Sequence, residues 1–484
     1  MTQTPAVLPN RRPAARQDAG AVPWRAVSVM LTGAFMAVLD TFIVLVAAPA
    51  IRADLHASAA DVQLVLAGYQ LTYAIALITG ARLGDLFGRK RMFMAGTALF
   101  TLASVACATA PGAGALIAAR MAQGLGAAVL FPQVLSMIQV LVPAARRPQA
   151  LGALGAVIGI SGSAGQLLGG VLVAAHLFGS SWRPVFWVNV PVGLLALALT
   201  AAYVPESRAP GARRLDPGGA VVLTGALFLL VVPLIEGREN GWPWWTWLSL
   251  AAAVPAFAAF VAVERRTEAR GGSPLVRPRL LRERPFAVGT CLVVVTYAGI
   301  NSCFLILSLT LQDGLGASAL GAAVVYLPFA VAFFATNLLS GRLARFGLRT
   351  LRAGALVTAA GYAAVIAFAS AGSSLRPWHL AVTLLPIGVG NGLLVPPLLG
   401  TVLSRVAPSE AGTASGVLAT AQQVGGALGV AVTGVLYYGT SGGAAEHDAA
   451  AYAHALGVTT VFHLALMAGV LGLLGLLRGR RSSR

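Results

Sequence analysis

The sequence predicts an all-α polytopic membrane protein with fourteen transmembrane helices and both termini on the cytoplasmic side. Of its 484 residues, 57% are hydrophobic and only 10% are charged, whereas a typical soluble domain has about 25% charged residues. Fourteen apolar stretches are each long enough to cross a hydrocarbon core of about 30 Å. Basic residues gather in alternate connections between these stretches, as the positive-inside rule requires.

Short polar or Gly/Pro turns separate most of the candidate spans, and one long charged linker occupies residues 265–285. The first 23 residues have no apolar core and are interpreted as a disordered cytoplasmic tail, and residues 478–484 as a basic cytoplasmic tail. The predicted spans cover residues 26–50, 62–81, 92–110, 114–138, 150–174, 184–203, 217–235, 244–263, 286–310, 318–341, 352–371, 379–403, 412–438 and 457–477.

The distribution of positive charge supports this topology. If the N-terminus is cytoplasmic, 29 of the 34 Lys and Arg residues fall in cytoplasmic segments, and 4 fall on the opposite side. Arg120 is the one basic residue left inside a span. The net charge of +18 is therefore explained by loops that orient the spans, and we expect no nucleic-acid partner.

The chain repeats its landmarks eight spans apart. Residues 81–91 after the second span resemble residues 341–349 after the tenth, and similar connections precede the Gly-rich fifth and thirteenth spans. An offset of eight predicts two six-helix bundles, residues 24–204 and 286–477, with an extra pair of spans in residues 205–264. Two related bundles around a central pathway are typical of transporters.

Two charged residues lie at membrane depth. Asp40 falls near the middle of the first span, where an ionised carboxylate costs a few to ten or more kcal/mol. Such a residue is a functional candidate, although a protonated or hydrogen-bonded acid packed between helices is the alternative. Arg120, in the fourth span, requires a carboxylate or several carbonyl partners, unless its side chain reaches the edge of the membrane.

Six motifs give the chain a resemblance to a known family. They occupy residues 39–51, 81–91, 118–132, 155–170, 182–193 and 204–207. Together they resemble the fourteen-span drug:proton antiporter branch of the major facilitator superfamily. The resemblance implies the major facilitator fold and a monomeric, proton-coupled exporter of drug-like or amphipathic molecules, working by alternating access in a bacterial cytoplasmic membrane. The alternatives are an importer or uniporter on the same fold, a dedicated exporter of one self-made natural product, and a non-transporting receptor or scaffold.

The resemblance also assigns roles to residues. It implies that Asp40 and Arg120 couple transport to the proton, which would be the coupling ion in place of any cofactor. In residues 81–91 it implies a latch at the cytoplasmic gate, for which a static charged turn is the alternative. The residues that match this gate motif are Leu83, Asp85, Gly88, Arg89 and Lys90.

The fifth span matches the antiporter motif, with one departure. Its usual form has Gly-Pro before the final Gly-Gly, and here Gln166 replaces that proline. Glutamine either weakens the kink or offers a polar group to the pathway, and glycine stripes also serve close helix packing. The matched positions are Gly155, Gly159, Gly165, Gln166, Gly169 and Gly170. We interpret residues 182–193 and 204–207 as a fold signature without chemistry.

Polar and aromatic side chains within the spans are candidates for lining a substrate cavity, although about half of them are expected to serve helix–helix hydrogen bonds. His463 is interpreted as structural. The sequence has no nucleotide-binding Gly-rich lysine motif and no metal-ligand spacing, so we expect neither ATP-driven export nor enzymatic activity. With one midplane acid, neutral or weakly charged substrates are favoured. The cavity candidates are Tyr69, Gln70, Tyr73, Gln123, Gln133, Asn301, Asn391 and Gln422.

Overall fold

A computed structural model describes residues 23–143, 146–208, 216–272, 274–276, 278–343, 346–403, 406, 411–441 and 448–477. Residues 1–22 and 478–484 of the predicted tails, and Arg345 of the repeated motif, lie outside the described residues. Within them, fourteen helices are long and apolar enough to cross a membrane, which confirms the predicted all-helical, fourteen-span architecture.

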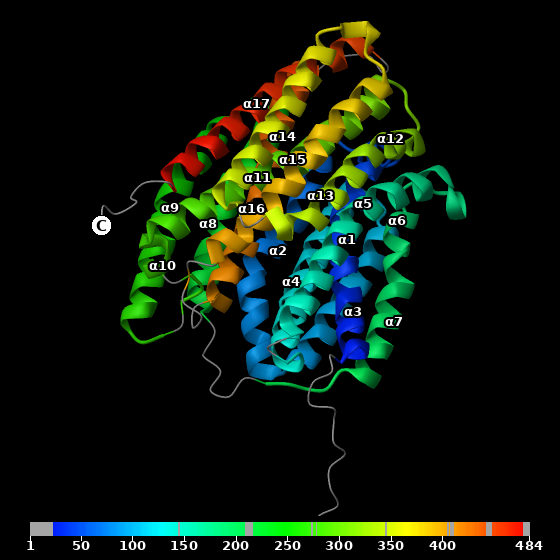
Figure 1. The fold of residues 1–484 in the computed structure, drawn as a ribbon. Coiled ribbons are helices and arrows are strands. Elements are labelled where there is room, and N and C mark those ends of the chain that lie inside the picture. Colours follow the sequence, from blue (N-terminus) through cyan, green and yellow to red (C-terminus); the bar gives the residue numbers. More distant parts are fainter. Residues whose placement is uncertain are drawn as a thin grey trace, which may run out of the picture.

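The helices follow the predicted spans closely (Figure 1). The first half contains α1 (Trp24–Leu55), α2 (Ala59–Phe87), α3 (Arg89–Ala108), α4 (Ala113–Leu141), α5 (Arg147–Ala174), α6 (Pro184–Trp187) and α7 (Asn189–Tyr203). The pair α8 (Pro217–Glu239) and α9 (Trp244–Ala269) and the short α10 (Pro278–Arg282) come next. The second half contains α11 (Arg284–Leu309), α12 (Ala319–Val325), α13 (Leu327–Leu343), α14 (Leu348–Ala369), α15 (Pro377–Leu403), α16 (Ala411–Ser441) and α17 (Ala449–Leu476).

Local sequence sets several of the helix ends. Ser58 and Asp61 form a capping box at the start of α2, in which each side chain accepts the other's backbone N–H at 3.0 Å. Gly88 separates α2 from α3 and has φ +107°, a backbone conformation that favours glycine. The turn between these helices is therefore fixed by one residue.

Two predicted spans are each built from two helices. The sixth span is divided at Val188 into α6 and α7, and the tenth is divided at Tyr326 into α12 and α13. A proline follows each break, Pro191 and Pro328, and proline has no N–H to continue the helical hydrogen bonding. In addition, α11 continues as a π-helical turn over Thr310–Gly314.

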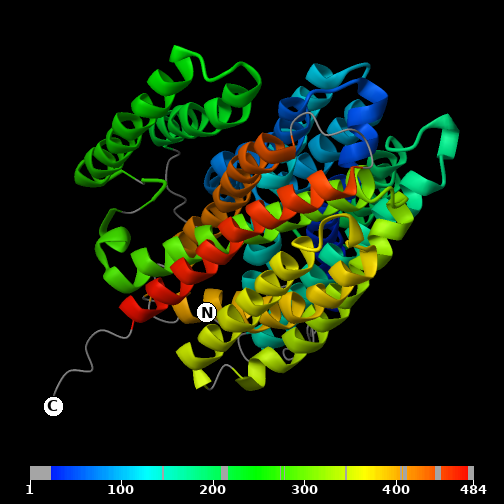
Figure 2. The same ribbon diagram turned by 90° about the horizontal axis from the view of Figure 1, so that it is seen from above.

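The helices form two main packing groups, which we call the first and second halves. In the first half α1 contacts α4, α5 and α7, while α2 and α3 pack on α4. In the second half α11 contacts α15, α16 and α17, and α14 lies against α15 and α17. The pair α8–α9 stands to one side of both groups when the molecule is seen from above (Figure 2), where α8 contacts α2 and α16.

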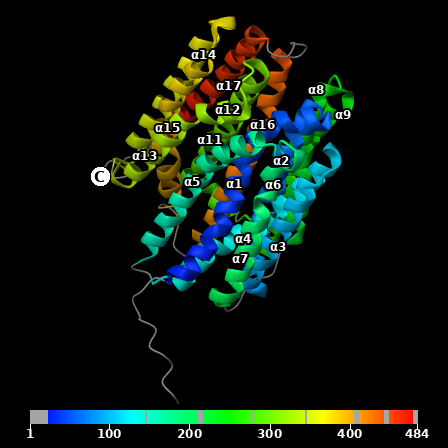
Figure 3. The same ribbon diagram turned by 90° about the vertical axis from the view of Figure 1, so that its right-hand side faces the viewer.

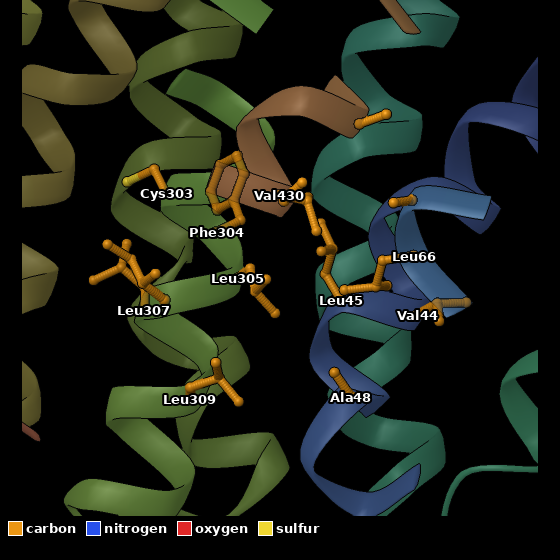
Figure 4. Close-up of a cluster of buried hydrophobic side chains, with 14 of the residues drawn as sticks. Val44, Leu45, Ala48, Leu66, Cys303, Phe304, Leu305, Leu307, Leu309 and Val430 are labelled. Atoms are coloured by element: carbon orange, nitrogen blue, oxygen red, sulfur yellow. The ribbon is translucent and has the colours of Figure 1, made fainter. Parts of the chain in front are cut away.

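The two halves meet through α1, α2 and α5 of the first and α11, α12, α13 and α16 of the second. Apolar side chains fill part of this junction: Leu305 of α11 points toward Leu45 of α1, and Phe304 lies beside Val430 (Figure 4). Because helices in a bilayer gain little from burying apolar surface, close packing must hold such a junction together.

The molecule has two faces with connecting segments, which we name after their first connections. The α2–α3 face carries the turn at Gly88 and the starts of α1 and α5, and the α1–α2 face carries residues 56–58 and the end of α5 (Figure 3). At the α1–α2 face the halves are joined by polar contacts. Gln312 Nε2 donates to Val46 O at 3.1 Å, and Arg52 lies 3.9 Å from Asp313.

The packing of α5 against the second half loosens along its length. Near the α1–α2 face, a Cβ added to Gly170 would lie 2.7 Å from Ala319 O, too close for any real side chain. Further along, a Cβ on Gly159 would meet Asn337 Nδ2 at 3.5 Å, an ordinary contact, and one on Gly155 would meet none of the described residues within 4 Å. The contact of α5 with the second half is therefore close at the α1–α2 face and opens toward the α2–α3 face, whereas α2 and α16 remain in contact there through Thr420 and Ala74.

Candidate functional site

Asp40 is fully buried in the first half, on the side of α1 that faces α4 and α7. Three side chains donate to its carboxylate. Arg120 Nη1 donates to Oδ2, while Gln123 Nε2 and Asn189 Nδ2 donate to Oδ1 at 2.8 and 2.9 Å. The three donors come from α4 and α7, so the carboxylate of Asp40 joins these two helices to α1.

Arg120 is equally buried, with only 1% of its side chain exposed. Its Nε donates to Val65 O at 3.2 Å, and its guanidinium lies 4.3 Å from the ring centre of Tyr69. Tyr69 in turn donates to Ala37 O at 3.0 Å. A buried ion pair is tolerated only when further hydrogen bonds satisfy its remaining groups, and here carbonyl, carboxylate and aromatic partners surround the cation.

Gln123 links the two charges. Its Oε1 accepts from Arg120 Nη1 at 2.6 Å, and its Nε2 donates both to Asp40 and to Ser104 Oγ at 2.8 Å. One network thus joins α1, α3, α4 and α7. Asp40 is a carboxylate partner of the kind that the sequence required for Arg120, and both side chains are buried inside the bundle, which disfavours a snorkelling arginine.

Sequence reasoning missed Asn189 and Ser104 as members of this network. Asn189 lies in the segment at residues 182–193, which was interpreted as a fold signature, and it is 1% exposed. An asparagine inside a predicted apolar span was the available signal, because polar groups at membrane depth need partners. Ser104 had no such signal, since a serine can bond its own helix; here its Oγ also donates to Phe100 O at 2.8 Å.

The predicted gate motif forms a compact turn at the α2–α3 face. Arg89 Nη2 donates to Asp85 Oδ1 at 2.8 Å within the same turn, and Lys90 Nζ donates to Ala201 O at 2.9 Å. Leu83 is half-buried. The contact of Lys90 ties the turn to the end of α7 in the first half.

Glu206 is a third residue that the sequence did not reveal. Its carboxylate accepts from the backbone N–H groups of Lys90 and Arg91 at 3.1 and 3.3 Å, and it lies 3.7 Å from the Arg91 side chain. A carboxylate at a helix N-terminus is stabilised by the unpaired N–H groups there. The motif at residues 204–207 therefore caps α3, a chemical role beyond a fold signature.

The glycines of the antiporter motif face α1 on one side and the second half of the molecule on the other. Gly165 and Gly169 lie against α1, where a Cβ on either would meet Leu39 O or Ile43 O at 2.8 or 2.9 Å. Gly170 faces α12 and Gly159 faces α13, while Gly155 has no neighbour at that distance. Gln166 is 2% exposed, and its Oε1 has no hydrogen-bond partner in the part of the chain that the structure describes.

The predicted cavity residues occupy different places. Gln70 of α2 and Asn301 of α11 both approach Gly426 of α16, at the junction of the two halves. Tyr69 and Gln123 belong to the ion-pair network, and Tyr73 packs edge-on against Tyr69 inside the first half. Of the remaining candidates, Gln133 donates to Gly80 O and Val129 O, and Asn391 donates to Ile387 O of its own helix. Gln422 is half-buried.

The second half has a buried polar pair that joins its first helix, α11, to α17. Ser302 of α11 lies 2.9 Å from His463 Nε2 of α17, and His463 Nδ1 lies 3.0 Å from Thr459 O. The ring of Tyr362 covers the imidazole at 5.4 Å. Both histidine nitrogens therefore have partners, in line with the structural interpretation of His463.

Comparison with solved structures gives the class of fold. A crystal structure of a peptide transporter with sulfate aligns with a TM-score of 0.65 and 15% identity, covering 94% of this chain and 96% of the other. The xylose transporter XylE from E. coli, in a partially occluded inward-open conformation, aligns with a TM-score of 0.60 and 16% identity, covering 93% and 99%. The chain therefore shares its multi-pass helical fold with these two proteins.

Comparison of sequences gives the family. The sequence profile of the Major Facilitator Superfamily matches residues 30–430, so the chain belongs to that superfamily. It is 38% identical over 445 residues to a probable actinorhodin transporter of Streptomyces coelicolor, covering 90% of this chain and 77% of the relative. A cephamycin export protein of Amycolatopsis lactamdurans is 37% identical, with 90% and 89% coverage. A methylenomycin A resistance protein of S. coelicolor is 32% identical, with 90% and 91% coverage.

Proposed function

We propose that this protein is a proton-coupled antiporter that exports drug-like or amphipathic small molecules across a bacterial cytoplasmic membrane by alternating access. The observation that carries the proposal is the buried Asp40–Arg120 pair, whose charge state can change only by gaining or losing a proton. The relatives named above as exporters and resistance proteins support the direction and the substrate class.

Protonation of Asp40 would disturb every contact in its network. The neutral carboxyl no longer balances the guanidinium, and its hydroxyl needs an acceptor where Gln123 and Asn189 now present donors. Leaving one partner of a buried pair uncompensated costs about 3–5 kcal/mol. Proton uptake would therefore drive α1, α4 and α7 into a new arrangement, which is the coupling step that we propose.

The arrangement of the halves suggests where this structure stands in the cycle. The positive-inside pattern predicts that the α2–α3 face is cytoplasmic, and the contact of α5 with the second half loosens toward that face. The structure would then be a state in which substrate enters from the cytoplasm. Closure at Gly155 and separation at Gly170 would produce the opposite state.

The energetics are sufficient for export. One pH unit supplies about 1.4 kcal/mol, and a potential of 100 mV supplies about 2.3 kcal/mol per charge. Exchange of one proton for one neutral substrate therefore supports roughly 500-fold accumulation. Exchange of one proton for one monovalent cation moves no net charge, so only the pH gradient drives it, and it supports roughly tenfold accumulation.

Transport in inside-out membrane vesicles tests the proposal. An acidic lumen should drive accumulation of a substrate dye, and collapse of the pH gradient should release it. An importer would instead accumulate the dye in right-side-out vesicles, and a uniporter would equilibrate it without a gradient; either result would refute the proposal. Because several relatives are named for single antibiotics, a panel of compounds also separates a multidrug exporter from a dedicated one.

A further inference from the structure

Gln166 is buried, and its side-chain oxygen has no hydrogen bond. The side chain is 2% exposed, and among the described residues Oε1 has no partner. Leaving a buried acceptor unpaired costs about 1–3 kcal/mol, so such a group in a membrane protein is a candidate for a ligand contact. Its position in α5 shows what it faces.

Helix geometry directs Gln166 toward the junction of the halves. Gly159 and Gly170 lie seven residues before and four residues after it, on the same stripe of α5, and they face α13 and α12 of the second half. Gly162, four residues before it, faces the Phe42 ring of α1 at 3.3 Å. Gln166 therefore points to the place where α1, α5 and α12–α13 meet.

Phenylalanine rings line the same place. Phe42 of α1 lies edge-on to Phe304 of α11 at 5.9 Å, and Phe304 lies edge-on to Phe329 of α13 at 4.9 Å. Phe329 stacks on Phe333 at 5.7 Å with an interplanar angle of 10°. We call Phe42, Phe304, Phe329 and Phe333 the aromatic ladder.

The aromatic ladder runs along the zone where α5 begins to separate from the second half. Phe333 lies 3.7 Å from a Cβ added to Gly159, between the tight contact at Gly170 and the open position at Gly155. The ladder has no charged member, and Phe42 and Phe333 are only partly buried. A molecule that entered from the α2–α3 face would meet Phe333 before the other rings.

We infer that the aromatic ladder and Gln166 form the substrate site, and that the substrate is a neutral, planar polycyclic aromatic compound with a hydroxyl group. Ring edges and faces favour stacked or edge-on contact with a flat aromatic molecule. The unpaired Oε1 of Gln166 can accept only from a donor, and a hydroxyl supplies one. This inference rests on the proposed export function and specifies its substrate.

The same helix also connects this site with the proton site. Asp40 and Phe42 are two residues apart, so their side chains lie about 200° apart around α1. Asp40 contacts α4 and α7, whereas Phe42 contacts α5 and α11. A shift of α1 on protonation would therefore change the aromatic ladder directly.

Binding of three pyrene probes tests the inference. Full-length protein in lipid nanodiscs is titrated with 1-hydroxypyrene, pyrene and 1-pyrenemethylammonium, and energy transfer from tryptophan is corrected with empty nanodiscs. We expect saturable binding, with 1-hydroxypyrene bound about tenfold tighter than pyrene because it forms one additional hydrogen bond. The cation should bind most weakly. Absence of saturable binding, or tighter binding of the cation, would overturn the inference.

Variants locate the site. Gln166→Leu and Gln166→Pro, the second restoring the proline usual in the motif, should each remove the preference for 1-hydroxypyrene while retaining pyrene binding. Phe333→Leu should weaken both neutral probes several-fold, and Phe368→Leu, a control ring stacked on His379 outside the ladder, should change neither. An unchanged preference in both Gln166 variants would refute the assignment.

Transport assays keep the two proposals apart. If Asp40-dependent export is found for another class of compound while the pyrene probes do not bind, the substrate inference fails and the proposed function stands. If the probes bind as expected but Asp40→Asn exports them normally, the proton-coupled mechanism fails and the binding site stands.

Discussion

Arg120 of α4 donates to Asp40 of α1, eighty residues earlier, and the two side chains are 1% and 0% exposed. Such a pair costs much desolvation energy, which its own attraction offsets only with additional hydrogen bonds. Val65 O, Gln123, Asn189 and the Tyr69 ring provide these contacts. The pair is therefore stable only as part of a complete hydrogen-bond network.

Removing one charge should destabilise the protein more than removing both. Asp40→Asn and Arg120→Gln should each lower the free energy of unfolding by about 3–5 kcal/mol, and the double variant should recover most of this loss. Arg52→Gln, in a pair that is 41% and 20% exposed, is the control, with an expected loss of at most about 1 kcal/mol. Unfolding in mixed detergent micelles measures the differences, and simple addition of the two single losses would contradict the prediction.

Asn189 should matter for transport because it donates to the charged carboxylate. Asn189→Leu removes one of the three donors, a loss of about 1.5–3 kcal/mol for a hydrogen bond to a charged group. We expect proton-coupled transport to fall at least about tenfold. Thr200→Val on the same helix is the matched control, since Thr200 bonds only to Ala196 O of its own helix; equal rates in both variants would show that Asn189 is not part of the site.

The Glu206 cap should stabilise the start of α3. Glu206→Gln keeps the size but removes the charge at the helix N-terminus, with an expected loss of about 1 kcal/mol. Gly88→Ala should also be destabilising, because a Cβ at φ +107° would lie 2.6 Å from Glu206 Oε1. Gly114→Ala, which would meet nothing within 4 Å, should be neutral. Thermal denaturation compares the stability of the three variants. If neither Glu206→Gln nor Gly88→Ala lowers the stability, the cap is excluded.

Opposite ends of α5 should respond oppositely to added volume. Gly170→Val should weaken the contact with Ala319 and Ala323 and shift the molecule toward the state open at the α1–α2 face. Gly155→Val should fit into the conformation of this structure and should oppose closure of the α2–α3 face. Spin-label distances between the halves, measured at both faces, report the shift; the same direction in both variants would argue against alternating closure around α5.

Composition and periodicity predicted the spans because the bilayer imposes a length and an apolar surface on every helix. They also identified Asp40 and Arg120, since charges within apolar spans are rare. The breaks at Val188 and Tyr326 were missed, although Pro191 and Pro328 were visible. A proline in a span can kink a helix as well as divide it, and the neighbouring helices decide between these outcomes.

The members of the network were harder to predict than its charges. Asn189 and Glu206 lie 149 residues from Asp40 and 116 residues from Lys90, respectively, and no local pattern brings such positions together. The aromatic ladder had no periodic signal either, because Phe42, Phe304 and Phe329 belong to three helices. Gln166 was visible as a departure from the motif, but the sequence could not show that its buried Oε1 has no partner among the described residues.

Proton movement triggered by substrate in proteoliposomes tests the central claim most directly. Wild-type protein and Asp40→Asn are reconstituted side by side, and a pH-sensitive dye reports proton flux when each compound of the panel is added. The account predicts flux with at least one compound for the wild type and none for Asp40→Asn. Equal flux in the two proteins would show that Asp40 is structural and that the buried pair does not couple transport to the proton.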